Sequence, residues 1–300
     1  MASQSLSDKE NWLVRFLRVQ KASDAQVAAV LQAALEDLDK HLSRIDAAPG
    51  VGAAVRRAQL LGNRGAITMV LSSLYKKLGD VVREGQANAA QAATEAEFHS
   101  ASKIYDRIIE DPAKREVLKR SLEQTSRRNI QVTVTRMTDS QQPLSKRLYR
   151  SEALSKGQVS RVVNSHLAKG SSAADMAKDL RSFFNPKVPG GVSFRAQTLA
   201  RSEINNAFHA QAAADMADRP WVNQSRWHLS GSHKVPDECN TYASIGLFPV
   251  DRIPKKPHPN CLCYITPDLP DVQTVINDYL AGKYNSWLAE HTDDGLRRSA

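Results

Sequence analysis

Residues 27–42, VAAVLQAALEDLDKHL, decide the class of fold, because their apolar positions recur at steps of three and four. Such steps place the apolar side chains on one face of an α-helix. A second stripe of the same kind follows an expected break at residues 49–52, at Ile67, Val70, Leu71, Leu74, Leu78 and Val81. The two stripes predict long helices in the part of the chain before residue 110.

The composition favours the same interpretation. Hydrophobic residues make up 41% of the 300 residues, but aromatic residues only 6%, and alanine is abundant. Alanine is the best helix former, whereas aromatic residues favour strands.

The formal net charge of +9 suits an anionic partner such as DNA, although a basic protein without such a partner can have the same charge. No run approaches the roughly 20 apolar residues that cross a bilayer, and residues 1–11 lack the apolar core of a secretory signal.

The residue composition changes after residue 220, and this change predicts a second kind of structure. Eight of the thirteen prolines and all three cysteines lie between residues 220 and 270, which excludes a long helix there. We therefore expect an α+β fold that is mostly helical. Its expected parts are a helical arm or bundle at 1–142, a domain at 143–270 whose helices precede a small β lobe at 221–267, and a short helical tail at 271–300.

A basic segment lies near the middle of the chain. Residues 111–150 hold ten basic and four acidic side chains, with no aromatic residue before Tyr149 to stack on bases. Phosphate contact and a solvated helix face both remain open for this segment. Ile130, Val132 and Val134 alternate with polar residues, a short pattern typical of a strand. The candidate DNA-binding residues are Lys114, Arg115, Lys119, Arg120, Arg127 and Arg128.

The expected β lobe carries a set of metal-ligand residue types. Cys239, His258, Cys261 and Cys263 are the ligand types of a tetrahedral zinc site, and His233 or Asp237 is a substitute ligand. Small lobes lack apolar area and often need such a staple. Two alternatives stay open: a disulfide between Cys239 and either Cys261 or Cys263, and free buried thiols beside a hydrogen-bonded histidine.

Several short motifs of this region occur in the order of one known family. They are Ala200-Arg201-Ser202-Glu203, Trp227, Asp237-x-Cys239, Gly246-Leu247-Phe248, and His258-Pro259-Asn260-Cys261-Leu262-Cys263. Together they resemble the phage Mu F-like head morphogenesis domain, the minor capsid (minor head) protein family of tailed bacteriophages. The likeness covers roughly residues 145–267 and rests on the series of motifs rather than on any one of them.

The chain departs from the family pattern at two positions. Leu262 stands where the family has arginine between the last two cysteines, and Tyr242 stands where a second cysteine would complete the first pair. Both departures weaken the inference of a metal site from the family, and three cysteines and one histidine are then the whole ligand inventory. We expect Arg201, Glu203 and Trp227 to be structural residues, the two charged ones pairing with the β lobe or with a neighbouring helix.

The resemblance implies a structural role and not an enzymatic one. It implies a low-copy protein of the virion, present in several copies in the head interior at the portal vertex and made in the host cytoplasm. The implied partners are the portal protein, the inner surface of the major capsid shell and packaged double-stranded DNA, in head assembly and in DNA packaging or delivery. The alternatives are a zinc-dependent nucleic-acid enzyme that uses His233 and Asp237, and a stand-alone DNA-binding module.

Overall fold

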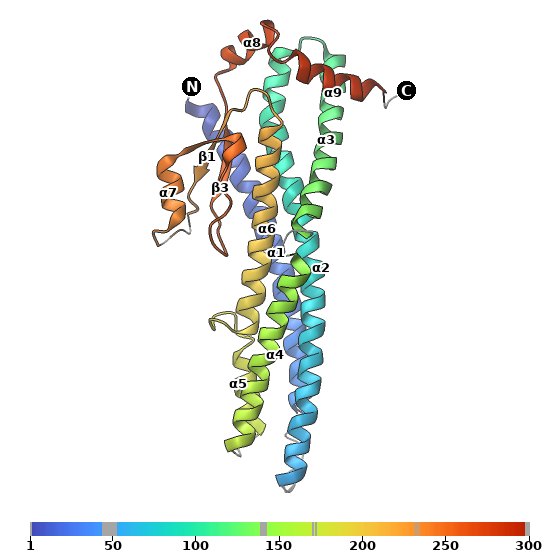
Figure 1. The fold of residues 1–300 in the computed structure, drawn as a ribbon, viewed down its shortest axis with the longest axis vertical. Helices are drawn as coiled ribbons and strands as arrows, with labels where there is room; N and C mark the ends of the chain where they lie inside the picture. Colours follow the sequence, from blue (N-terminus) through green and yellow to red (C-terminus); the bar gives the residue numbers. More distant parts are fainter. Residues whose placement is uncertain are drawn as a thin grey trace. The chain divides into compact units, whose positions relative to one another are not determined.

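The computed structural model describes residues 2–43, 53–138, 143–169, 171, 173–231, 233 and 235–297. These residues form a mostly helical α+β fold, the expected class (Figure 1). The helices are α1 (Ala2–Ser43), α2 (Ala53–Ile108), α3 (Pro112–Thr138), α4 (Leu144–Lys169), α5 (Ala173–Ser182), α6 (Val192–Ala217), α7 (Glu238–Ile245), α8 (Val272–Leu280) and α9 (Asn285–Arg297). The strands are β1 (Gln224–His228), β2 (Leu247–Pro249) and β3 (Tyr264–Asp268), with a 3-10 turn, η1, at Val250–Arg252. The break expected at residues 49–52 and the junction expected at residues 141–142 fall outside the described residues.

The chain divides into two compact units, and each is built from separate stretches. Unit 1 comprises Met1–Gln20, Gly85–Met137 and Ile204–Ala300, and unit 2 comprises Lys21–Glu84 and Thr138–Glu203. Helices α1, α2 and α6 contribute residues to both units. The units therefore do not follow the boundary expected at residue 142, because each combines segments from before and after it.

Unit 2 has a helical core in which the two apolar stripes are buried. Val27, Leu31, Leu38 and Leu42 of α1 lie in this core, with positions of the second stripe on α2 and side chains from α4, α5 and α6. A methyl group on Gly79 of α2 would lie 3.0 Å from Cδ1 of Leu148 on α4, so a glycine at this position allows close approach. The stripes predicted from the sequence are thus core-facing, as their spacing requires.

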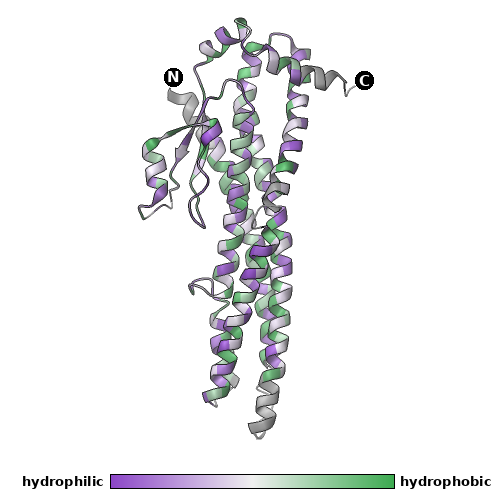
Figure 2. Ribbon diagram, viewed as in Figure 1, coloured by the Kyte–Doolittle hydropathy of each residue, from purple (hydrophilic) through white to green (hydrophobic). Residues whose placement is uncertain are grey.

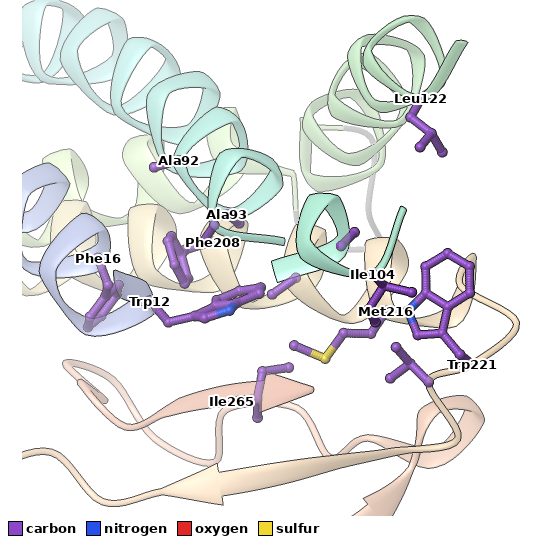
Figure 3. Close-up of a cluster of buried hydrophobic side chains, with 14 of the residues drawn as sticks. Trp12, Phe16, Ala92, Ala93, Ile104, Leu122, Phe208, Met216, Trp221 and Ile265 are labelled. Atoms are coloured by element: carbon purple, nitrogen blue, oxygen red, sulfur yellow. The ribbon is translucent and has the colours of Figure 1, made fainter. Parts of the chain in front are cut away.

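Unit 1 has a core that joins helices to the sheet. Figure 3 shows Trp12 and Phe16 of α1 beside Phe208 of α6, and Met216 near Ile265 of β3. The rings of Trp12 and Phe208 meet edge to face with centroids 6.1 Å apart. Most of the chain's few aromatic residues lie in this unit, which also contains the small sheet.

The sheet has three antiparallel strands in the order β2-β1-β3. Trp227 of the central strand pairs with Ile265, and both side chains are buried. Pro249 and Pro267 occupy the two outer strands, where a missing backbone donor costs no ladder bond. The β lobe expected at 221–267 is therefore present. It contains one element that was not expected, helix α7, which lies between β1 and β2 in the sequence.

The prediction of a strand at residues 130–134 is wrong, because these residues belong to α3. Ile130 and Val134 are four apart, so on a helix they share one face, and both are half-buried, whereas Val132 is 38% exposed. Figure 2 shows apolar and polar residues interspersed along all the long helices. No helix in the described part of the chain offers a stretch apolar and long enough for a membrane crossing.

Candidate metal centre

Three cysteines from two segments meet inside the β lobe. Cys239 is the second residue of α7, and Asp237 fixes the start of that helix by accepting the backbone N–H of Cys239 at 2.7 Å. Cys261 and Cys263 lie in the turn that leads into β3. All three thiols are buried, none being more than 2% exposed. A helix N-terminus also favours a negatively charged group such as a thiolate.

The sulfur atoms are close enough to share one ion. The Sγ atoms of Cys239 and Cys261 are 3.5 Å apart, and the three sulfur atoms lie within 4.8 Å of one another. A disulfide needs a bond of about 2.05 Å. The cysteines are free thiols in this structure, and the group they form could hold a metal ion.

His258 completes the cluster on its solvent side. Its Nδ1 donates to the backbone carbonyl of Pro259 at 2.9 Å, which directs Nε2 towards the sulfur atoms. Nε2 lies 3.5 Å from Sγ of Cys239 and 3.0 Å from Oδ2 of Asp237. A metal-bound histidine commonly donates its second ring N–H to a carbonyl in this way.

The two substitute ligands occupy different positions. Asp237 forms a second close group with Cys239 and His258, so its carboxylate is near the same ion position. The imidazole of His233 donates from Nε2 to Oδ1 of Asn240 at 2.7 Å, and the same oxygen accepts the backbone N–H of Asp237. Asn240 is absent from the sequence-based site, and here it holds the start of α7 in place. Acceptance by Asn240 raises the pKa of His233, with a smaller contribution from Asp237.

The three thiols differ in pKa, so they do not ionise equally readily. Burial raises the pKa of Cys239 to about 12. The hydrogen bond from Cys261 lowers the pKa of Cys263 to about 5, assisted by the backbone N–H of Ser230, while the pKa of Cys261 is raised. Without an ion, burial therefore opposes the simultaneous ionisation of all three thiols. A divalent cation would remove that penalty, because metal ligation deprotonates thiols outright.

The two departures from the family pattern have packing roles. Tyr242, where a second cysteine was missing, lies edge to face with Trp227 at 5.0 Å and with Phe248 at 5.9 Å. Leu262 packs against the same core as a partly buried side chain. Trp227 is itself buried, and its ring contacts those of Tyr242 and His209.

Arg201 and Glu203 each pair with a residue of another helix. Arg201 on α6 makes two hydrogen bonds to Asp24 of α1, at 2.8 and 3.1 Å. Glu203, whose side chain is 5% exposed, accepts from Arg147 of α4 at 2.6 Å. Burial raises the pKa of Glu203, against the opposing effect of Arg147. All four residues lie in unit 2, apart from the cysteines in unit 1.

The candidate DNA-binding residues lie on α3 in unit 1, and half of them are paired. Lys119 and Arg115 approach Asp106 at 3.1 and 3.7 Å, and Arg120 pairs with Glu116 one turn away. The side chains of Lys114, Arg127 and Arg128 are exposed. Fewer basic side chains on α3 are therefore available to contact phosphate than the number of basic residues indicates.

Comparisons with protein-family models, with curated proteins and with solved structures found no match to this chain.

Proposed function

We propose that Cys239, Cys261, Cys263 and His258 hold a structural zinc ion that fixes the β lobe. The observation that carries this proposal is a pair of close groups that share Cys239: the three buried cysteines, and Cys239 with His258 and Asp237. Zinc–sulfur bonds of about 2.3 Å put the sulfur atoms of a tetrahedral site about 3.8 Å apart. The Cys239–Cys261 separation of 3.5 Å needs only a small adjustment to reach that value.

The chemistry of the ligand set supports a structural ion and not a catalytic one. Structural zinc sites are closed by four protein ligands, commonly three cysteines and one histidine, whereas catalytic sites keep one position open for water. Asp237 caps α7, and His233 is bonded to Asn240, so the groups that an enzyme would use already have packing roles. A four-ligand site also supplies the staple that a small sheet needs.

We further propose, from the resemblance to the Mu F-like family, that the protein is a minor head protein of a tailed phage. In this proposal it binds the portal and the inner shell in a few copies per particle and acts in head assembly and DNA packaging or delivery. Apart from the motif at 200–203, the motifs that carry the resemblance lie in the candidate metal centre and its surroundings: Trp227, Cys239, the step at 246–248 and the run at 258–263. Their convergence is a reason to treat them as one functional unit.

Quantitative mass spectrometry of purified procapsids and mature particles from the phage that encodes the chain tests this role. We expect a few to about a dozen copies per particle, co-purifying with the portal protein. Absence from both kinds of particle would refute the head role. It would also direct attention to a zinc-dependent nucleic-acid enzyme, for which nuclease activity lost in His233→Ala is the test.

A second candidate activity is contact with DNA phosphates, which the exposed Lys114, Arg127 and Arg128 on α3 favour. Each phosphate contact removed from duplex DNA lowers the slope of log affinity against log salt by about 0.9. We expect Arg127→Ala/Arg128→Ala to reduce that slope by roughly 1 to 2 for a random-sequence duplex. Arg120→Ala, which removes a residue paired with Glu116, is the matched control. Identical slopes for the wild type and the double variant would exclude α3 as the contact surface.

A further inference from the structure

Lys256 lies next to the candidate metal centre and is absent from the sequence-based site. It precedes His258 in the loop between η1 and β3. Its Nζ donates to the backbone carbonyls of Cys261 and Cys263, both at 2.9 Å. One ammonium group therefore binds both cysteines of the Cys-x-Cys pair through their main chain.

The cysteines supply the negative charge near Lys256 in the part of the chain that the structure describes. The charges that act on it are those of Cys261, Cys263 and Cys239. The centroid of the Phe16 ring lies 5.0 Å from Nζ, and the charge of Lys256 also acts on His209. The side chain of Lys256 is partly buried. A cation removed from water needs a counter-charge nearby.

We propose that Lys256 is the counter-charge of the zinc site: its ammonium group neutralises the loaded cluster and sets its affinity for zinc. This inference rests on the zinc site proposed above. Three thiolates and one neutral imidazole around a divalent ion leave one negative charge, and the ammonium group of Lys256 balances it. The two carbonyl bonds hold that charge beside the sulfur atoms, so Lys256 is a positioning residue and not a ligand.

A purely structural role for the same side chain predicts a different set of variant effects. Lys256→Gln keeps an N–H donor for a carbonyl but has no charge. Lys256→Met keeps the aliphatic part of the side chain but has neither charge nor donor. Lys256→Arg keeps both the charge and the donors. A counter-charge role predicts that Gln and Met behave alike and that Arg rescues. A hydrogen-bonding role predicts that Gln behaves like the wild type.

The test measures zinc affinity of the full chain by competition with a chromophoric chelator. We expect Lys256→Gln and Lys256→Met to bind zinc at least about ten-fold more weakly, the lower end of the loss seen when residues that support metal ligands are removed. Lys256→Arg should stay within about three-fold of the wild type. Exposed Lys255 supplies the control, and Lys255→Met should bind like the wild type. Wild-type affinity in Lys256→Gln would overturn the counter-charge, whereas no zinc binding by the wild type would overturn the metal site itself.

A second measurement avoids variants that fail to fold. Lysine modification by an amine-reactive reagent is followed by mass spectrometry on the wild-type chain, with zinc and after chelation. Zinc should protect Lys256 several-fold and leave Lys255 unchanged. Equal labelling of Lys256 in the two states of a zinc-binding wild type would contradict the proposal.

Discussion

His209 is a buried histidine held in its neutral form. It lies on α6 with its ring against Trp227, and its Nε2 donates to the carbonyl of Pro254 at 2.9 Å. Burial lowers its pKa to about 3, with Lys256 acting in the same direction. The unfolded chain binds a proton at this residue near pH 6.5, and the folded chain does not. The free energy of unfolding therefore falls as the pH drops below about 6.5, because protonation favours the unfolded state.

His209→Gln should remove this part of the pH dependence, since glutamine can donate to Pro254 without titrating. Between pH 7.5 and pH 5 we expect the wild type to lose about 2 kcal/mol more stability than the variant. Urea unfolding at the two pH values measures the difference. Exposed His99 supplies the control, His99→Gln. Parallel pH profiles for the wild type and His209→Gln would show that His209 is protonated in the folded protein.

At the residue scale, the sequence predicted the cluster of three cysteines and His258 but not the residues that surround it. Cys239, His258, Cys261 and Cys263 were recognisable because few other roles call for those residue types so close together. Lys256 and Asn240 were not, because their roles depend on which carbonyl or imidazole the folded loops bring near them. Tyr242 was taken only as a missing cysteine, and its aromatic contacts follow from the packing of α7 on β1.

At the scale of elements, a buried ion pair joins α2 to the segment that follows α6. Arg219 makes two hydrogen bonds to Glu97, at 3.0 and 2.9 Å, and one to Asp218 at 2.7 Å. The side chains of Arg219 and Glu97 are only 2% and 4% exposed. Burial raises the pKa of Glu97 to about 7, against the opposing effect of Arg219. Removing one partner of a buried pair leaves the other charge inside the protein without compensation.

We expect Glu97→Gln to lower the free energy of unfolding by about 3 kcal/mol, at the low end for broken buried pairs because Asp218 remains. Glu116→Gln, which breaks the exposed pair with Arg120, should cost less than about 0.5 kcal/mol. Chemical denaturation of the three proteins at pH 8 gives both values. A loss for Glu97→Gln no larger than that of the exposed control would mean that Arg219 finds another acceptor.

The predictability of an element depended on the length of its pattern. The long stripes on α1 and α2 were confirmed because a 3.6-residue period repeated over several turns has no competing interpretation. The five-residue alternation at 130–134 misled, because it also fits a helix with Ile130 and Val134 on one face. Helix α7 was missed although Asp237 and Gly246 bound it as caps, since the proline-rich flanks favoured turns.

At the scale of the whole molecule, the division into units follows packing rather than chain order. Helices α1, α2 and α6 run from one unit into the other, so no linker or change of composition marks the boundaries near residues 20, 84 and 203. A boundary read from sequence has to fall between elements, and here the boundaries fall within them. All four proposed zinc ligands belong to unit 1.

Removal of the metal should therefore act locally. After chelation we expect faster amide hydrogen exchange in residues 224–268 and unchanged exchange in α4 and α5 of unit 2, because local stability reflects local contacts. Exchange followed by mass spectrometry with and without chelator checks this. Equal exchange in the lobe under both conditions, in a protein that has released zinc, would show that the ion does not stabilise the lobe.

The zinc content of the purified chain shows whether the cysteine and histidine cluster holds a metal ion. Elemental analysis by mass spectrometry, on protein purified without added metal or chelator, should give about one zinc ion per chain, falling to near zero in Cys261→Ser. No zinc in the wild type, together with a folded lobe that chelator does not perturb, would contradict the account. The three thiols would then be ordinary buried cysteines.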